Sequence, residues 1–164
     1  MDFYLLKSLD LKEKNKLEFV ETVVVNEGVT CDVYSFPADP TKDLGIIKIK
    51  PAHTTPLQRI LAGERTIEGH ISGNGMLTVI REGKHKNVFI VKDVYLGKLN
   101  VDVNIGDLMQ WQAAADSNLV VYEICYPPYK DGRFENLPNR IISSNKAQQG
   151  LQIGLELDFG NKSE

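Results

Sequence analysis

A chain of 164 residues is long enough for one domain that buries roughly two-thirds of its unfolded surface. Hydrophobic residues make up 42% of it and charged residues 25%, a composition that excludes disorder as the main state. The formal net charge of -3 and the pI near 5.7 exclude the basic surface typical of proteins that bind nucleic acid or anionic membranes.

The expected compartment follows from the apolar segments and the cysteines. No segment has the run of about 20 apolar residues that a membrane-spanning helix needs. The first residues, MDFYLLKSLDLKEKNKLEF, are interrupted by charges and lack the apolar core of a signal peptide. The sequence therefore predicts a cytoplasmic protein. In a reducing cytosol, Cys31 and Cys125 are expected as buried thiols rather than as a disulfide, because they form no CxxC unit.

Along the chain, one short charged helix is expected first, at Leu9–Lys16. Alternating runs rich in β-branched and aromatic residues then follow, each closed by Gly, Pro, Asn or Asp. These runs predict eight strands at a spacing of roughly ten residues. The expected strands are Leu17–Val25, Val29–Pro37, Leu44–Pro51, Arg65–Ser72, Met76–Gly83, Lys86–Leu96, Asn100–Ile105 and Leu119–Tyr126. A second short helix is expected after Pro138, and a last strand at Gly150–Phe159.

Many short strands with turn residues between them favour a sandwich or a barrel. A parallel α/β fold would need amphipathic helices between the strands, and the sequence shows none. It also shows no repeat, linker or low-complexity tract. We therefore expect one domain over residues 1–164, with a core at approximately 17–130 and a C-terminal extension at 131–164.

Three central segments resemble the cupin superfamily in their order and spacing. Lys48–Val79 is similar to the first cupin motif, whose glycine-turn hairpin corresponds to the ISGNGML stretch. Val101–Trp111 contains a Gly-Asp step like the one that opens the second motif. Glu123–Tyr129 resembles the Pro-terminated strand that often closes the barrel. This resemblance implies an all-β double-stranded β-helix, a jelly-roll barrel here with one or two short helices, that is usually dimeric and has its pocket inside the barrel.

Metal-binding cupins take two histidines of an HxH pair and a glutamate from the first motif, and a third histidine from the second. In this sequence the HxH position is occupied by Gln58–Ile60. The glutamate position falls on Glu64 or Thr66, depending on the direction of counting, and the third histidine position falls near Asp116 or Ser117. Isoleucine cannot bind a metal, and an amide is a poor substitute for imidazole. The resemblance therefore implies no standard metal site here and no cofactor.

An acid–base pair is the main catalytic hypothesis. Strand alternation places Thr66, Glu68 and His70 in one row, which faces either solvent or the interior of the barrel. If the row faces inward, Glu68 and His70 stand about 6.5–7 Å apart along the strand and can serve as catalytic residues. Histidine suits this role because its ordinary pKa of about 6.5 allows it to exchange protons at neutral pH.

Further ligand-binding candidates come from several segments. His53 lies in a loop at the end of a strand, as a surface residue or a ligand contact. Trp111 either packs in the core or stacks on a ring or sugar at a pocket wall. Glu123 interrupts an apolar strand and needs a partner, either Arg59, Arg65 or the barrel interior. The complete set of expected ligand-binding residues is Gln58, Thr66, His53, Trp111 and Glu123.

Composition alone assigns two more segments. His85 lies in the charged stretch REGKHKN, which predicts an exposed turn. Tyr126–Pro138 is dense in turn formers and aromatics, and either folds over the barrel mouth or packs against a partner subunit.

No P-loop, GxGxxG, HExxH, GxSxG or zinc-knuckle spacing occurs, so nucleotide-binding and classical hydrolase functions lack support.

The leading hypothesis is a cupin-like protein whose non-metal barrel pocket binds a small polar or sugar-like molecule. A second hypothesis is a metal-independent isomerase, epimerase or lyase that uses histidine and carboxylate acid–base chemistry. A metal-dependent oxygenase with a rebuilt site and a purely structural dimer are also compatible with the sequence. The expected partners are an unidentified small molecule and a second copy of the chain.

Overall fold

The computed structural model describes residues 17–81, 84–93 and 99–138. These residues form eleven antiparallel strands and no helix long and apolar enough to cross a membrane. The strands are β1 (Glu18–Asn26), β2 (Val29–Ser35), β3 (Asp43–Ile49), β4 (Leu57–Ile60), β5 (Arg65–Gly73), β6 (Gly75–Arg81), β7 (His85–Val91), β8 (Asn100–Val103), β9 (Leu108–Ala113), β10 (Leu119–Tyr126) and β11 (Phe134–Leu137).

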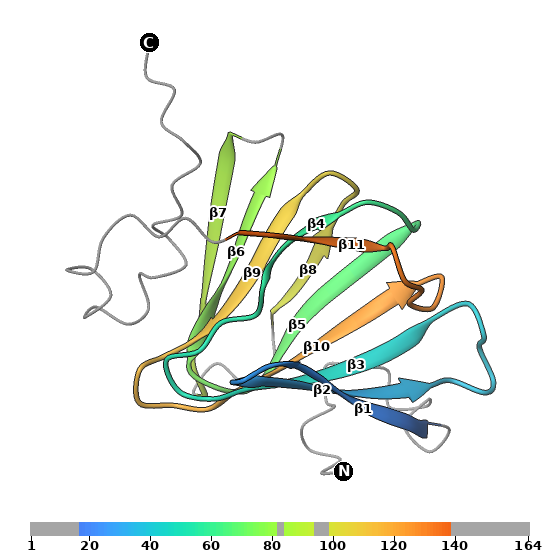
Figure 1. Cartoon of the computed structure of the whole chain (residues 1–164), viewed down its shortest axis with the longest axis horizontal. Helices are drawn as coiled ribbons and strands as arrows, with labels where there is room; N and C mark the ends of the chain where they lie inside the picture. Colours follow the sequence, from blue (N-terminus) through green and yellow to red (C-terminus); the bar gives the residue numbers. More distant parts are fainter. Residues whose placement is uncertain (1–16, 82–83, 94–98, 139–164) are drawn as a thin grey trace.

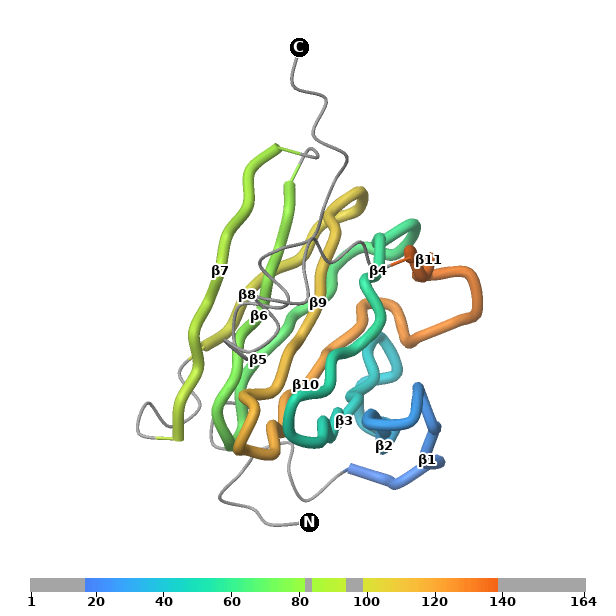
Figure 2. The backbone as a smooth tube through the Cα atoms, turned by 60° about the vertical axis from the view of Figure 1, so that its left-hand side comes forward, coloured from blue at the N-terminus to red at the C-terminus, as the bar shows by residue number. Residues whose placement is uncertain are grey.

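The strands form two sheets that face each other as a jelly-roll barrel (Figure 1). The six-stranded sheet has the order β1-β2-β3-β10-β5-β8, and the five-stranded sheet has the order β11-β4-β9-β6-β7. Strands far apart in sequence, such as β3, β10 and β5, therefore lie side by side (Figure 2). The fold is the all-β barrel that the sequence predicts.

All eight predicted strands are present, with ends that differ by a few residues. Three further strands, β4, β9 and β11, were not predicted. β9 alternates apolar and polar residues from Met109 to Ala113, but its polar residues, Gln110 and Gln112, are buried like their apolar neighbours. β4 and β11 have four residues each, too few to show a pattern. The helices expected at Leu9–Lys16 and after Pro138, and the strand expected at Gly150–Phe159, lie outside the described residues.

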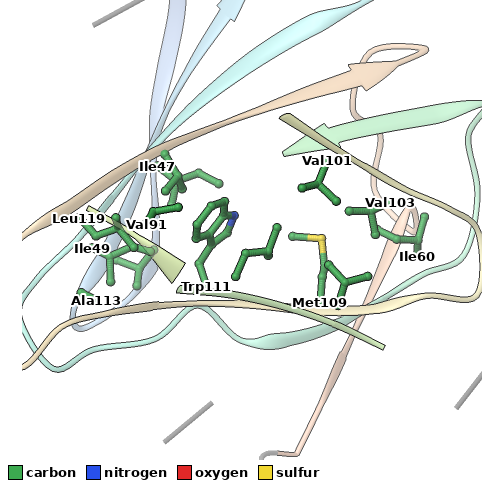
Figure 3. Packing of buried hydrophobic residues seen from close by; sticks show 14 residues of the cluster. Ile47, Ile49, Ile60, Val91, Val101, Val103, Met109, Trp111, Ala113 and Leu119 are labelled. Atoms are coloured by element: carbon green, nitrogen blue, oxygen red, sulfur yellow. The ribbon is translucent and has the colours of Figure 1, made fainter. Parts of the chain in front are cut away.

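The interior of the barrel is filled by one apolar cluster drawn from both sheets, which we call the barrel core (Figure 3). Trp111 of β9 lies at its centre and is fully buried. The cluster consists of Val29, Ile47, Ile49, Ile60, Leu77, Val79, Val91, Val101, Val103, Met109, Trp111, Ala113, Leu119 and Val121. Leu119 and Val121 alternate on β10 with residues that face the other way, so the core identifies which face of each strand points inward.

The outward face of the six-stranded sheet carries a second apolar cluster. It consists of Phe36, Leu44, Ile46, Ile67, Ile71, Tyr122 and Ile124. Tyr122 lies directly opposite Gly69 of β5, and a Cβ at Gly69 would be 2.1 Å from its ring. Since Ile67, Gly69 and Ile71 of β5 lie on this outward face, the alternating residues Thr66, Glu68 and His70 point into the barrel.

The two glycine motifs noted in the sequence mark tight turns. Gly73, between β5 and β6, has φ +83°, and Gly106, before β9, has φ +88°. Both values lie in the left-handed region that glycine adopts without strain. At Gly73 a Cβ would also meet the carbonyl oxygen of Asn118 at 1.8 Å. Asp107 fixes the second turn, because its Oδ2 accepts a hydrogen bond from the backbone N–H of Asn104 at 2.8 Å.

Candidate functional site

Two carboxyl groups face each other inside the barrel. In the antiparallel pairing of β5 with β10, Glu68 lies directly opposite Glu123. Directly opposed residues have Cβ atoms about 4.5–5.5 Å apart. In the same cross-strand row, Gly45 of β3 lies opposite Glu123, and Val101 of β8 lies opposite Glu68. Two adjacent acids thus stand in a row that is otherwise apolar.

Glu68 is fully buried, and one oxygen of its carboxyl group has a hydrogen-bond partner. Its Oε2 accepts a hydrogen bond from the indole Nε1–H of Trp111 at 2.6 Å. Its Oε1 is buried without a hydrogen-bond partner among the described residues. The carboxyl group of Glu123 is its neighbour across the strand pair.

Burial raises the pKa of Glu68 well above its ordinary value, and the neighbouring carboxyl group of Glu123 raises it further. The Trp111 hydrogen bond lowers this pKa, but by less than the other causes raise it. Glu68 is therefore held as the neutral acid at pH values where an exposed glutamate is ionised.

Two thiols surround the second carboxyl group. Glu123 is half-buried, and its Oε1 accepts a hydrogen bond from the Sγ of Cys125 at 3.1 Å. Cys31 of β2 occupies the space that Gly45 leaves open, since a Cβ there would be 3.0 Å from its Sγ. We call Glu68, Glu123, Cys125 and Cys31 the carboxyl–thiol cluster.

Both thiols are held in the protonated form. Burial, followed by the charge of Glu123, raises the pKa of Cys31 to about 12. The same two causes, in the same order, raise the pKa of Cys125. Neither cysteine forms a disulfide, in agreement with the sequence prediction, although Cys31 is half-buried rather than buried. Cys125 donates a hydrogen bond to Glu123, and protonated thiols such as these two are poor nucleophiles.

One end of the barrel, next to the cluster, is closed by a buried arginine. Cys125 lies opposite Thr66 on one side and Asp43 on the other. The guanidinium group of Arg133 donates to Thr66 Oγ1 at 3.1 Å and to the carbonyl oxygens of Arg65, Tyr126 and Pro127. Its Nε is buried with no acceptor within hydrogen-bonding distance among the described residues.

Asp43 is the third carboxyl group at this end. Burial raises its pKa, and a hydrogen bond from the backbone N–H of Tyr129 together with the charge of Arg133 works in the opposite direction. The bond from Tyr129 to Asp43 Oδ2 is 2.8 Å long. We call Asp43, Thr66 and Arg133 the arginine end of the barrel.

The segment between β10 and β11 folds back over the arginine end. Tyr129 is tied to Asp43, and its ring stacks on Phe134 with centroids 5.7 Å apart. The backbone oxygen of Arg133 accepts a hydrogen bond from the N–H of Leu61 at 2.8 Å. The sequence left open whether Tyr126–Pro138 folds over the barrel mouth or packs against a partner subunit. In the structure this segment folds over its own barrel.

His70 lies in the same inward row as Glu68 but has a different partner. Its ring is buried, and Nε2 is 2.8 Å from the carbonyl oxygen of Gly73, so Nε2 carries the hydrogen. Glu68 is bonded instead to Trp111. Glu68 and His70 lie in one inward row, as expected, and the strand register sets Glu68 opposite Glu123; the acid–base pair of Glu68 with His70 stays a prediction.

The remaining expected ligand-binding residues lie apart from the carboxyl–thiol cluster. Gln58 of β4 donates to Asn136 Oδ1 of β11 at 3.2 Å. His53 follows β3, at the end of the barrel opposite Asp43, and its Nδ1 is 2.8 Å from the carbonyl oxygen of Pro51. Its ring covers Gly28, where a Cβ would be 2.0 Å away. The structure gives His53 a packing role between β1–β2 and β3.

The two arginines named as possible partners of Glu123 are paired elsewhere, and Glu123 faces the barrel interior, the other alternative that the sequence left open. Arg59 forms a 3.2 Å ion pair with Glu135, and Arg65 forms a 2.5 Å ion pair with Asp102. His85 is exposed at the start of β7, as its charged surroundings predict.

The residues at the cupin metal positions do not fit a histidine–carboxylate centre. Ile60 is packed in the barrel core, and the amide of Gln58 is bonded to Asn136. The Nε2 of His70 is hydrogen-bonded to a carbonyl oxygen. Within the described ranges, no group of three or more His, Cys, Asp and Glu side chains is arranged to hold a metal ion.

Sequence reasoning did not identify Asp43 or Arg133. Arg133 lies in a stretch that reads as a loop, and nothing in its neighbours indicates that its side chain turns back into the barrel. The pairing of Glu68 with Glu123 depends on the register of two strands that are more than 50 residues apart in the chain. Only the isolated charge of Glu123 in an apolar strand gave a signal for this site.

Solved structures share this fold. A structure of oxalate decarboxylase from Bacillus subtilis determined at pH 4.6 matches with a TM-score of 0.57, 19% identity and 73% of this chain covered. A Trp-to-Tyr variant of the same enzyme gives the same TM-score and identity over 70% of this chain. A structure describing the substrate binding mode of oxalate decarboxylase gives a TM-score of 0.55 and 20% identity.

At this level of identity the similarity establishes the cupin-like jelly-roll fold alone. The chain spans only 29–30% of the length of those structures. No protein-family model matches the sequence, and no curated protein matches it.

Proposed function

We propose that this cupin-like protein binds a small polar molecule at the arginine end of its barrel, with Glu123 as the main contact. The observation that carries the proposal is the pair of opposed carboxyl groups, one neutral and fully buried, the other half-buried and able to meet a ligand.

The cost of this pair supports a functional role. Placing a carboxyl group in an apolar interior costs several kcal/mol unless it is fully compensated. The neighbouring inward positions of the same sheet are filled by Val101, Ile47 and Val121. The barrel therefore accommodates aliphatic residues at this level, so packing does not require acids there. Strongly perturbed carboxyl groups of this kind are enriched at functional sites.

The chemistry of the site favours ligands rich in hydroxyl groups. Glu123 is acceptor-only when ionised and binds O–H donors. Arg133 has one buried N–H, at Nε, that is free to donate to a ligand oxygen. Sugars, polyols and small hydroxy acids present both kinds of atom. Glu68 lies opposite Glu123 on the neighbouring strand and is fully buried.

A ligand screen tests this function. The melting temperature is measured with a panel of sugars, polyols and hydroxy acids, because a ligand of the native state raises it by mass action. At least one compound is expected to stabilise the unchanged protein and Glu135→Gln, which removes an exposed carboxylate, but not Glu123→Gln. The proposal fails if no compound in the panel acts, or if Glu123→Gln responds as strongly as the unchanged protein.

Acid–base catalysis is a second function, favoured by the two opposed carboxyl groups, of which the buried Glu68 has a raised pKa. Two carboxyl groups in different environments can supply an acid and a base within one site. Glu123, the half-buried member, would take a proton from a carbon next to a carbonyl group. This is the chemistry of an isomerase, epimerase or lyase that uses no metal.

Hydrogen exchange into bound compounds tests this second function. Hits from the screen are incubated in D2O, and loss of their C–H signals is followed by NMR. Exchange is expected with the unchanged protein and should be absent with Glu123→Gln. Glu68→Gln should still bind the compound but catalyse the exchange more slowly. Exchange that continues in Glu123→Gln at the original rate would refute it.

A further inference from the structure

The second apolar cluster, which we call the outward cluster, is buried although it points away from the barrel core. It consists of seven large side chains on the outward face of the six-stranded sheet, and each is at most 7% exposed. All eleven strands of the described ranges belong to the two sheets, so none of them lies over this face (Figure 1). A buried face of this kind requires a covering segment, because proteins rarely leave large apolar patches to solvent.

The charges on this face lie at its rim and are paired with one another. Lys48 and Asp32 form an ion pair of 2.6 Å towards β2, and Arg65 and Asp102 form one of 2.5 Å towards β8. The central strands β3, β10 and β5 present aliphatic and aromatic side chains between these two pairs. The surface therefore fits an apolar segment rather than a charged one.

The first described residue of the chain already contacts the outward cluster. Leu17 packs against it, and residues 1–16, MDFYLLKSLDLKEKNK, precede Leu17 in the sequence. Seven of the first eleven residues are apolar, among them Phe3, Leu5 and Leu9, whereas none of residues 12–16 is. Five polar residues span up to about 16–18 Å, which is enough to cross three strands that lie about 4.8 Å apart.

The C-terminal part of the chain starts from the other sheet. Leu137, at the end of β11, packs against a separate apolar cluster of the five-stranded sheet, formed by Leu57, Ile80 and Leu108. The residues that follow Leu137 therefore leave the barrel on the side away from the outward cluster. Of the two segments outside the described strands at the chain ends, residues 1–16 are the one that begins on this face.

We propose that residues 1–16, the N-terminal arm, dock on the outward face of the six-stranded sheet of their own chain, with the apolar residues of 1–11 against the outward cluster. Docking removes apolar surface of both the arm and the sheet from water, which is the main favourable contribution to such a contact. Ile67 and Tyr122 of the outward cluster lie on the strands that carry Glu68 and Glu123 on their inward faces. The arm is thus placed behind the carboxyl pair, outside the proposed binding site.

Substitutions in the arm test the apolar contact on the full chain, with no residues added before Met1. Leu5→Asp should lower the melting temperature by about 4–8 °C, the shift expected when a chain of this size loses one buried leucine. Lys7→Asp introduces the same residue at a polar position of the arm and should leave the melting temperature unchanged. Equal melting temperatures for the two variants would overturn the proposal. Circular dichroism confirms that each variant is folded, and Leu9→Asp replaces Leu5→Asp if the latter is not.

A nitroxide spin label on the arm tests its position. Ser8→Cys supplies a thiol for the label at a polar position, and the two native thiols are held protonated by burial and by Glu123. The label is expected to broaden the amide NMR signals of Ile67 and Tyr122 and to leave those of Val88, on the five-stranded sheet, sharp.

A mixed sample separates an arm on its own chain from an arm on a second copy. Spin-labelled protein without nitrogen-15 is mixed with unlabelled protein that contains it, and the signals of Ile67 and Tyr122 should then stay sharp. Broadening in the mixed sample, broadening of Val88 in place of Ile67 and Tyr122, or no broadening in the single-protein sample would overturn the proposal.

Discussion

Replacing Glu68 by glutamine should change how stability depends on pH. The introduced amide has the shape of a protonated glutamate, so it can accept the Trp111 hydrogen bond as the neutral acid does. It differs in one respect, because it has no proton to lose. The variant therefore isolates the ionisation of this single buried group.

The direction follows from the raised pKa of Glu68. Above its ordinary pKa of 4.5, an unfolded chain has released this proton while the native protein still holds it. The native state then binds more protons than the unfolded state, so raising the pH favours unfolding. The contribution of Glu68 is complete below pH 4.5 and is lost between 4.5 and the native pKa, by up to about 1.4 kcal/mol per pH unit.

Urea denaturation at a series of pH values measures the effect. Relative to the unchanged protein, Glu68→Gln should be nearly neutral at about pH 4.5 and should gain stability as the pH rises above it, by up to about 1.4 kcal/mol per pH unit until the native pKa is reached. Glu135→Gln, which removes an exposed carboxylate, should show no such trend. A difference between Glu68→Gln and the unchanged protein that stays constant with pH would refute the protonated buried acid.

Three further predictions concern the groups around this acid. Trp111→Phe removes the donor to Glu68 and should lower the free energy of unfolding by about 2–4 kcal/mol; urea denaturation showing less than about 1 kcal/mol would contradict the importance of that bond. Arg133→Met should lower the free energy of unfolding by about 3–5 kcal/mol because four acceptors lose their donor, whereas Arg59→Met, which breaks an exposed ion pair, should lower it by about 0.5 kcal/mol or less. Equal melting temperatures for the two variants would contradict a stabilising role of the buried Arg133 hydrogen bonds. Cys31, whose pKa is raised to about 12, should react with a disulfide reagent at pH 8 only after unfolding; rapid labelling of the native protein would show that the thiol is not held protonated.

The sequence predicted the barrel because its signals are local. Alternation and turn residues identified eight strands, and Gly73 and Gly106 occupy the left-handed turns that their motifs indicate. β9 was missed although Met109–Ala113 alternates apolar and polar residues; the run is short, and its glutamines are buried rather than facing solvent.

The candidate site was only partly predictable, because it depends on strand register. Alternation placed Glu68 and His70 in one row, and the structure puts that row inside the barrel. Local spacing suggested that these two would act together, whereas the pairing of β5 with β10 sets Glu68 against Glu123. Arg133 reaches the site from a loop, and no periodic pattern specifies where a loop returns.

Infrared spectroscopy of the carboxyl groups at neutral pH tests the neutral buried acid most directly. A neutral carboxylic acid has a C=O stretching band separate from the carboxylate bands, and the band shifts in D2O. The unchanged protein and Glu135→Gln are expected to show this band at pH 7, and Glu68→Gln is expected to lack it. A spectrum of the unchanged protein with carboxylate bands alone would contradict the protonated form of Glu68, and with it the proposed binding site.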